Sequence, residues 1–299
     1  MKGIIFTNAY VNTGDIAFQP DRLKQEFENL GVEICVKAND FFPIRIEDGK
    51  IAHSLDKYDF CVFLDKDKYV LKAIEKCGIP VYNAYEPITV CDDKMLTFLE
   101  LANNGIPMPK TLPGLLCFDQ NAKINETTVD TVIQNLGLPV IVKECFGSLG
   151  KGVHLAKTKD ELFEICNKVK SKPHLFQEFI PSSYGKDVRV IVVGDEVVGA
   201  ILRASDSDFR SNISSGGHGE KFELSQELKD LALKITRLLG LKYCGMDFLF
   251  GKDGEYLVCE VNSNAFFKGF ERVTEINVAK KYAEFILKDL SKSNGATHE

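Results

Sequence analysis

Residues 246–262, MDFLFGKDGEYLVCEVN, decide the fold of the C-terminal part of the chain, because two apolar runs flank a turn. The turn segment 251–254 contains the Asp-Gly pair that is typical of β-hairpins. A four-residue loop would pair Phe250 with Glu255 and Asp247 with Val258. The stretch therefore predicts an antiparallel hairpin.

The two faces of this hairpin should differ in chemistry, since side chains alternate along a strand. Asp247, Glu260 and Asn262 share one face. The other face is apolar and suits a core; it carries Met246, Phe248, Phe250, Leu257, Cys259 and Val261. Hard oxygen donors bind Mg²⁺ or Mn²⁺, and such ions usually share substrate phosphates. The pattern is typical of a metal and phosphate site, and a solvated acidic face is the alternative.

Composition narrows the class of protein. A chain of 299 residues with 44% hydrophobic content can fold into two or three packed units. The net charge of -6 and the lack of a Lys/Arg block do not favour nucleic-acid binding. The nine cysteines show no Cys-x-x-Cys pair, which argues against a zinc site or a disulfide framework and fits a reducing cytoplasm. No apolar stretch resembles a signal peptide or a membrane span, so we expect a cytoplasmic protein without membrane contact.

Residues 1–88 are expected to form an α/β domain. Apolar strands are predicted at 3–7 and 32–36, on either side of a helix that Pro20 opens and Gly31 ends. A second unit follows, with strands at 60–64 and 79–82 around a helix at 70–77. Strands that alternate with short helices predict a parallel sheet covered by helices.

Two further units are expected after this domain, a central α+β lobe at residues 89–181 and a C-terminal lobe at 182–290. The central lobe should hold a helix capped by residues 92–94. A strand at 140–144, a glycine loop, a strand at 152–156, a helix at 159–169 and a strand at 175–179 should follow. The C-terminal lobe should hold a hairpin at Gly194 and Asp195, a helix, the hairpin of residues 246–262 and a last helix. Residues 291–299 are small and polar, and we expect a flexible tail.

The segment 146–152, FGSLGKG, lies between two predicted strands of the central lobe. Gly147, Gly150 and Gly152, with Ser148 between them, allow backbone N–H groups to turn toward a polyphosphate. The spacing is neither a Walker loop nor a Rossmann fingerprint, and an ordinary flexible hairpin is the alternative. Lys143 favours the phosphate interpretation, because an ammonium group in an apolar strand lacks a partner unless an anion binds there.

Two later segments fit a nucleotide site. The connection at residues 177–181 could bind an adenine edge through its backbone, or it could be a plain linker. Arg189 and Arg203 lie in the two strands of the hairpin at Gly194. A two-residue turn would put these arginines on opposite faces, whereas a three-residue turn with a bulge would put them on one face. On one face they could clamp a phosphoryl group and a carboxylate.

Together these motifs resemble the RimK-type branch of the ATP-grasp ligases, the branch that includes the enzyme adding glutamate to a ribosomal protein. The similarity extends over nearly the whole chain. The matching stretches, in the family's order, are residues 93–96, 142–143, 147–153, 177–180, 187–189 with 193–195, 209–212 with 216–217, and Asp247 with 260–262.

The resemblance implies an ATP-grasp fold, with both α/β and α+β parts, preceded by an N-terminal Rossmann-like domain. It also implies an ATP site in which Lys94 and Lys143 hold phosphates, Asp187 meets the ribose, and Asp247, Glu260 and Asn262 bind two Mg²⁺ or Mn²⁺ ions. The residues implied around the nucleotide are Lys94, Lys143, Gly147, Ser148, Gly150, Gly152, Gln177, Glu178, Phe179, Ile180, Asp187, Arg210, Ser211 and Asn212, and those implied in catalysis are Arg189, Arg203 and Arg210.

The reaction implied by the resemblance joins a carboxylate to an amine. The carboxylate attacks the γ-phosphate of ATP to give an acylphosphate and ADP, and an amino acid or peptide amine then displaces phosphate. A catalytically silent nucleotide-binding regulatory protein and a carboxylate phosphotransferase are the alternatives. The resemblance also implies a homo-oligomer, a dimer or a tetramer.

Two segments depart from the family pattern. Residues 214–217 read SSGG, where the glutamate-adding enzymes tend to have a basic residue before the double glycine. Residues 263–271 read SNAFFKGFE in place of a Ser-Pro-Gly turn. Both segments border the expected substrate pocket. Phe266, Phe267 and Lys268 therefore suggest a different or bulkier substrate, although adjacent aromatic residues are more often core.

Overall fold

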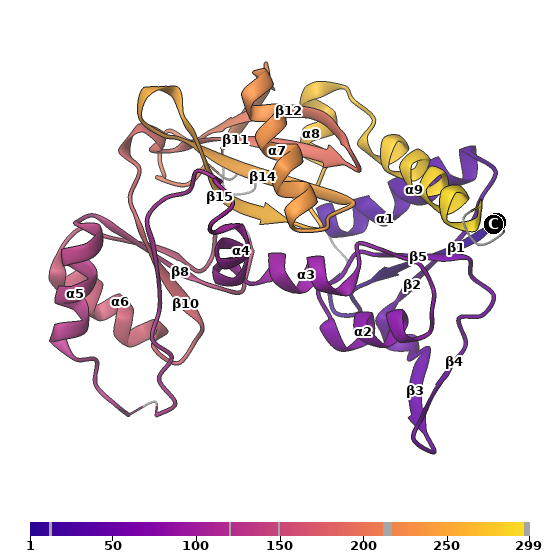
Figure 1. Ribbon diagram of the computed structural model, residues 1–299, viewed down its shortest axis with the longest axis horizontal. Helices are drawn as coiled ribbons and strands as arrows, with labels where there is room; N and C mark the ends of the chain where they lie inside the picture. The colour runs from indigo at the N-terminus through magenta and orange to yellow at the C-terminus, as the bar shows by residue number, and fades with distance from the viewer. Residues whose placement is uncertain (12–13, 120, 149, 212–216, 296–299) are drawn as a thin grey trace.

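The computed structural model describes residues 1–11, 14–119, 121–148, 150–211 and 217–295. Figure 1 shows an N-terminal α/β domain at one end, a central lobe at the other end, and a C-terminal lobe above them. No helix within these ranges is long and apolar enough to cross a membrane.

The N-terminal domain is built on a parallel sheet of order β2-β1-β5-β6, as the alternation of strands and helices predicted. Its elements are β1 (Lys2–Thr7), α1 (Asp15–Asn29), β2 (Glu33–Ala38), β5 (Phe60–Phe63), α2 (Lys68–Lys76) and β6 (Val81–Tyr82). The prediction that Pro20 opens the first helix is wrong, because α1 begins at Asp15 and contains Pro20. Pro20 lies just beyond the first turn and removes one backbone hydrogen bond. A small hairpin of β3 (Ile44–Glu47) and β4 (Lys50–His53), which the sequence did not predict, projects from this domain (Figure 1).

Two helices lead from this domain toward the central lobe, α3 (Tyr85–Asp92) and α4 (Lys94–Leu101). The predicted cap is confirmed, since the Asp93 carboxylate accepts the backbone N–H groups of Met95 and Leu96. The central lobe is an antiparallel sheet of order β7-β10-β8-β9 with two helices packed on it. Its elements are β7 (Thr111–Pro113), α5 (Glu126–Leu136), β8 (Val140–Glu144), β9 (Val153–Ala156), α6 (Lys159–Val169) and β10 (His174–Glu178).

The C-terminal lobe is a five-stranded sheet of order β13-β12-β11-β14-β15. Its elements are β11 (Lys186–Val193), β12 (Glu196–Ala204), β13 (His218–Phe222), α7 (Gln226–Leu238), β14 (Tyr243–Phe250), β15 (Tyr256–Asn262), α8 (Lys268–Thr274) and α9 (Val278–Gly295), and the 3₁₀ turn η2 (Pro181–Ser183) precedes them. Helix α7 covers one face of the sheet, while α8 and α9 cover the other. Helix α9 continues past Ser291, where the sequence predicted the tail to begin.

Two bulges set which side chains face the site. In the β11–β12 hairpin a two-residue turn pairs Val193 with Glu196, and a register shift follows between Ile191 and Val192. Arg203 consequently lies opposite Asp187, on the same face as Arg189. The one-face arrangement therefore occurs, but with the shorter turn and a bulge inside the strands.

The β14–β15 hairpin differs from the predicted register. Phe250 pairs with Tyr256 instead of Glu255, and a bulge between Asp247 and Phe248 places Asp247 opposite Glu260 instead of Val258. Asp247, Glu260 and Asn262 still share a face, since Asn262 is two residues from Glu260 along the strand. Cys259 was expected on the apolar face, but it lines the site cavity beside Lys143.

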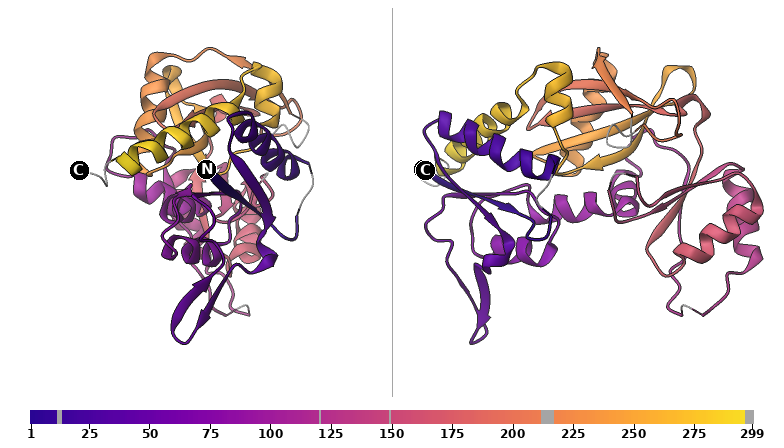
Figure 2. Two further views of the ribbon diagram at one scale, coloured as in Figure 1. Left: turned by 90° about the vertical axis from the view of Figure 1, so that its right-hand side faces the viewer. Right: turned by 180° about the vertical axis from the view of Figure 1, so that it is seen from behind.

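The N-terminal domain and the C-terminal lobe share one hydrophobic core. Phe27 and Phe60 of the first belong to the same buried cluster as Tyr243, Phe267 and Tyr282 of the second. Buried Asn83 connects the two parts through four hydrogen bonds, donating to the carbonyls of Tyr243 and Ser263 and accepting from the backbone of Lys242 and Tyr243. The central lobe stands apart from the N-terminal domain (Figure 2, right). It has a separate core made of Val129, Val132, Val140, Val142, Ala156, Leu162, Cys166, Val169 and Phe176.

Candidate active site

A cavity of about 130 Å³ lies between the central and C-terminal lobes. The structure brings all the described residues of the predicted nucleotide set to its wall: Lys94, Lys143, Gly147, Ser148, Gly150, Gly152, Gln177, Glu178, Phe179, Ile180, Asp187, Arg210 and Ser211. Asn212 lies outside the described residues. Of the other predicted residues, Arg203, Asp247 and Glu260 line this cavity too. Arg189 and Asn262 line a second cavity next to it.

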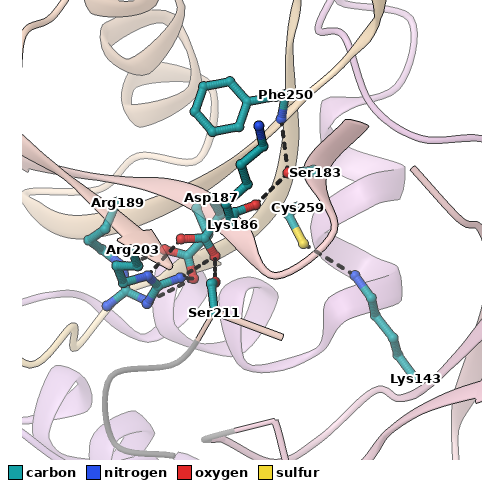
Figure 3. Close-up of polar contacts among 10 residues, drawn as sticks. Lys143, Ser183, Lys186, Asp187, Arg189, Arg203, Ser211, Phe250 and Cys259 are labelled. Carbon is teal, nitrogen blue, oxygen red and sulfur yellow. Dashed lines mark hydrogen bonds and ion pairs between the residues drawn. The ribbon is translucent and has the colours of Figure 1, made fainter. Parts of the chain in front are cut away.

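Lysine side chains form one wall of the first cavity. The buried Lys143 ammonium has a weak acceptor, the Sγ atom of Cys259 at 3.4 Å (Figure 3). Burial raises the pKa of the Cys259 thiol, so the sulfur is neutral and does not compensate the lysine charge. Lys94 donates to the carbonyl of Gly147 at 3.1 Å and lies 3.3 Å from a Glu260 oxygen. A buried ammonium group without a counter-charge, as at Lys143, favours an anionic ligand.

The glycine loop between β8 and β9 is held over this cavity by cations. Arg210 donates to the carbonyl of Gly150 at 2.8 Å, and its guanidinium also binds Asp208. The hydrogen bonds between these two residues lower the pKa of Asp208 and raise that of Arg210, so both stay charged. From the N-terminal domain, the Lys68 ammonium lies over the Phe146 ring at 4.7 Å.

A buried network of two arginines and two aspartates forms the base of the site (Figure 3). Arg189 makes a two-pronged contact with Asp247, and one prong measures 2.7 Å. Arg203 binds Asp187 at 2.7 and 2.5 Å and reaches Asp247 at 2.9 Å. The Ser211 hydroxyl donates to Asp187 at 2.5 Å. Planar guanidinium groups suit such paired contacts, which fix the arginine heads in position.

The two aspartates of this network titrate differently. Burial raises the pKa of Asp187, and the charge of Asp247 adds to the shift although Arg203 opposes it. Burial acts in the same direction on Asp247, but the charges of Arg189 and Arg203 outweigh it and lower the pKa of that carboxyl group. The lowered pKa keeps Asp247 ionised, as a cation ligand must be.

The residues proposed as metal ligands fit a divalent cation that is shared with a phosphate. Asp247 and Glu260 lie directly opposite each other, and the buried side-chain nitrogen of Asn262 has no hydrogen-bond partner within the described ranges. The amide group of Asn262 is therefore not used by the fold, whichever way it is oriented. Among the described residues no group of three His, Cys, Asp or Glu side chains could hold an ion alone. Phosphate oxygens would complete the coordination.

The predicted adenine segment lies at the far end of the cavity. The Gln177 side chain donates to Thr111 at 2.9 Å, and the Glu178 carboxylate accepts the backbone N–H of Lys110 at 2.6 Å. These side chains are therefore engaged within the central lobe. The backbone of the segment, with Phe179 and Ile180 beside it, lines the cavity.

Several lining residues were not among the predicted site residues, including Lys186, Phe209, Leu249 and Cys259. Cys259 depends on the bulge in the β14–β15 hairpin, which no residue in the turn signals. Lys186 directly precedes Asp187, and its ammonium lies over the Phe250 ring at 5.3 Å (Figure 3). No pattern in the sequence distinguishes Lys186 from an ordinary solvent-exposed lysine.

The second cavity is larger, about 640 Å³, and it shares Ser148, Arg203 and Glu260 with the first. The side chains of residues 266–268, in the segment that departs from the family pattern, lie in two different environments. Phe267 is fully buried in the shared core, whereas Phe266 and Lys268 line the second cavity. Phe267 therefore packs in the core, and Phe266 is a pocket residue, so each of the two expectations holds for one phenylalanine.

Three lobes with a cavity between the last two are the arrangement expected of an ATP-grasp fold. D-alanine–D-alanine ligase from Bacillus anthracis, solved with ATP, superposes with a TM-score of 0.73 at 17% identity, over 99% of each chain. The model of the RimK-like ATP-grasp domain matches residues 91–286. The chain belongs to the RimK-like ATP-grasp family.

Relatives with assigned names support this membership. N-acetylaspartylglutamate synthase A from Homo sapiens is 39% identical over 225 residues, which are 75% of this chain and 56% of the relative. A probable alpha-L-glutamate ligase from Legionella pneumophila is 35% identical over 222 residues, which are 73% of this chain and 70% of the relative. The chain thus matches little more than half the length of the human synthase.

Proposed function

We propose that the chain is an ATP-dependent carboxylate–amine ligase that works through an acylphosphate. The observation that carries the proposal is the junction of the two cavities at Ser148, Arg203 and Glu260. A nucleotide in the first cavity would direct its terminal phosphate toward a carboxylate in the second. Such positioning is most of what phosphoryl transfer requires from a protein.

In the first step a carboxylate oxygen of the acid substrate attacks the γ-phosphorus of ATP, and the bond to the oxygen bridging to ADP breaks. Lys94, Lys143 and Arg210 neutralise the phosphate charge. Asp247 and Glu260, with Asn262, would hold Mg²⁺ or Mn²⁺, which supplies further charge neutralisation on the phosphate oxygens. We propose that two such ions bind, as the resemblance implies.

In the second step the amine nitrogen attacks the acyl carbon, phosphate leaves with the electron pair of the C–O bond, and the nitrogen loses a proton. Arg189 and Arg203 stabilise the charge on the acyl oxygens and on the leaving phosphate. The resemblance assigns Asp187 to the ribose. Its bonds to Arg203 and Ser211 favour a positioning role, because they fix the Arg203 head. The glycine loop would keep water from the acylphosphate.

We propose an amino acid of the glutamate class as the amine, because both named relatives have glutamate in their names. A cytoplasmic location is proposed as well, since all nine cysteines are free thiols. Assembly into a dimer or tetramer stays a prediction from the resemblance.

The test is ADP release from the full chain with MgATP, over a panel of carboxylates and amines. Glu260→Gln should lower the rate by about 10²- to 10³-fold, the usual loss when one group that stabilises transition-state charge is removed. The matched control is Asp195→Asn, an exposed acid in the β11–β12 turn, which should leave the rate unchanged. A chain that is silent with every pair would favour the nucleotide-binding alternative. ADP release without an amine requirement would favour a phosphotransferase.

A further inference from the structure

The second cavity has a cationic rim that the proposed chemistry does not use. Lys268 and Arg272 of α8 both line the cavity, and both are exposed at its edge. They are four residues apart on one helix, so their side chains lie on the same face. Like charges at this spacing disfavour a helix unless an anion lies between them.

Most of the other charges around this cavity are engaged within the protein. Arg189 and Arg203 bind the buried aspartates, and Lys66 binds Asp92 at 2.7 Å. Glu260 lies 3.3 Å from Lys94, and Glu271 lies 3.5 Å from Arg22.

The remaining charges leave the rim positive. In the part of the chain that the structure describes, Lys268, Arg272 and the facing Asp15 are the cavity-lining charges without an ion pair. Two cations against one acid leave an excess positive charge at the rim.

Aromatic packing fixes the position of this rim. The Lys268 ammonium lies over the Phe18 ring of α1 at 5.3 Å, and α1 packs against α8 (Figure 1). Phe270, one turn into α8, is buried in the shared core. The rim cations are therefore carried by a helix that is anchored between two parts of the molecule, which preorganises them for a ligand.

The order in which the reactants lie along the two cavities indicates which substrate lies beside the rim cations. In the proposed function the nucleotide fills the first cavity and the acid substrate lies at the junction near Arg203. The amine adds to a face of the planar acyl carbon, so it needs space beside the acyl group that the nucleotide does not fill, and the rest of the second cavity offers that space. A volume of about 640 Å³ accommodates two small substrates.

We infer that Lys268 and Arg272 bind a carboxylate of the amine substrate and thereby select an acidic amino acid over its neutral analogue. The inference rests on the proposed function and identifies the residues that would set its specificity. Lys268 lies in the segment that departs from the family pattern, so this contact residue is a feature of this chain.

Binding measurements on the full chain with MgADP can test the inference without turnover. L-glutamate and L-glutamine serve as probes, since they are matched in size and differ in one charge. The wild type should bind glutamate at least about tenfold more tightly, as expected for a charge-assisted contact of about 1.5 kcal/mol or more. Lys268→Met with Arg272→Met should remove this preference and leave glutamine affinity unchanged. The methionine in Lys268→Met still covers the Phe18 ring, so packing between α8 and α1 is retained.

Two controls separate recognition from fold. Lys268→Arg in the Arg272→Met background keeps one cation and should restore part of the preference, and Lys280→Met on the exposed face of α9 should change nothing. Equal binding of the two probes by the wild type, or an unchanged preference in the double variant, would overturn the inference. ADP release by the wild type is assayed in parallel. Release without a glutamate preference rejects the inference alone, whereas failure to bind MgATP and to release ADP rejects the proposed function.

Discussion

The central lobe and the rest of the molecule are held together in different ways. The N-terminal domain and the C-terminal lobe share a buried cluster that runs from Phe27 to Tyr282. The central lobe keeps its own cluster, although Leu175 of its strand β10 also joins the buried cluster of the C-terminal lobe. Its links at the cavity include polar contacts from Lys143 to Cys259 and from Arg210 to Gly150. An apolar interface resists opening more than a few polar contacts in water do. We therefore expect the central lobe to move more easily against the C-terminal lobe than the N-terminal domain does.

The largest expected effect is in the shared core. Phe267→Ala removes a fully buried ring that contacts Phe18 and Tyr243, with centroids 6.1 and 6.4 Å away. We expect a loss of about 4 kcal/mol in unfolding free energy, as for other buried phenylalanines. Urea unfolding followed by hydrogen exchange should show the N-terminal domain and the C-terminal lobe losing protection together. Loss confined to the C-terminal lobe would show that the two parts are independent.

A smaller loss is expected inside the central lobe. Leu162→Ala opens a cavity in the separate cluster and should destabilise it by about 3 kcal/mol. Because this lobe has its own core, exchange should rise in residues 111–119 and 121–148 and leave the shared core protected. The Phe267→Ala protein provides the reference pattern. Identical exchange patterns in the two variants would contradict the division into two units.

The contact between Lys68 and Phe146 should have a weaker effect. Lys68→Met removes a cation–π contact between α2 and the glycine loop, worth about 0.5–1 kcal/mol, so exchange in residues 145–148 should rise about two- to fivefold. The matched control is Lys72→Met on the same helix, which loses a similar contact with Tyr85 within the N-terminal domain. If both variants loosen the loop equally, the contact does not couple the domain to the loop.

The smallest expected effect is a response of the central lobe to pH. Burial lowers the pKa of His154 on β9 below 6.5, Lys168, Arg210 and Lys172 add to the shift, and Glu144 opposes it. Protonation therefore favours the unfolded lobe, so its stability is complete above about pH 6.5 and declines as the pH falls through the lowered pKa. Protection factors in the central lobe should fall between pH 7 and pH 5, by less than about tenfold per unit of pKa shift. His154→Gln should flatten the profile, and an unchanged profile would exclude His154 as the cause.

The sequence predicted the helices, strands and loops of the site better than the pairing registers of the two hairpins. Capping at Asp93, the glycine loop, and strand β8 follow from local patterns, and the structure has them at the predicted residues. The bulges in both hairpins could not be predicted, because an extra strand residue is selected by contacts across the sheet and not by the turn. Cys259 therefore changed faces, although Asp247 and Glu260 stayed together.

The sequence also could not predict that the N-terminal domain and the C-terminal lobe share one core. Phe267 and Asn83 are far apart along the chain, and no periodicity shows that they meet the same neighbours. Phe266 and Phe267 are adjacent and chemically alike, yet one lines a cavity and the other fills a core. Such assignments depend on tertiary packing, which local patterns do not encode.

The four hydrogen bonds of Asn83 bear on any attempt to express the ATP-grasp domain alone. The family model begins at residue 91, so a truncation at its border would delete Asn83 and strip the partners from Lys242, Tyr243 and Ser263. The truncation would also expose to solvent the aromatic side chains of α9 that α1 covers. A recombinant fragment designed on homology alone should therefore aggregate, and the first 88 residues belong in every expression design.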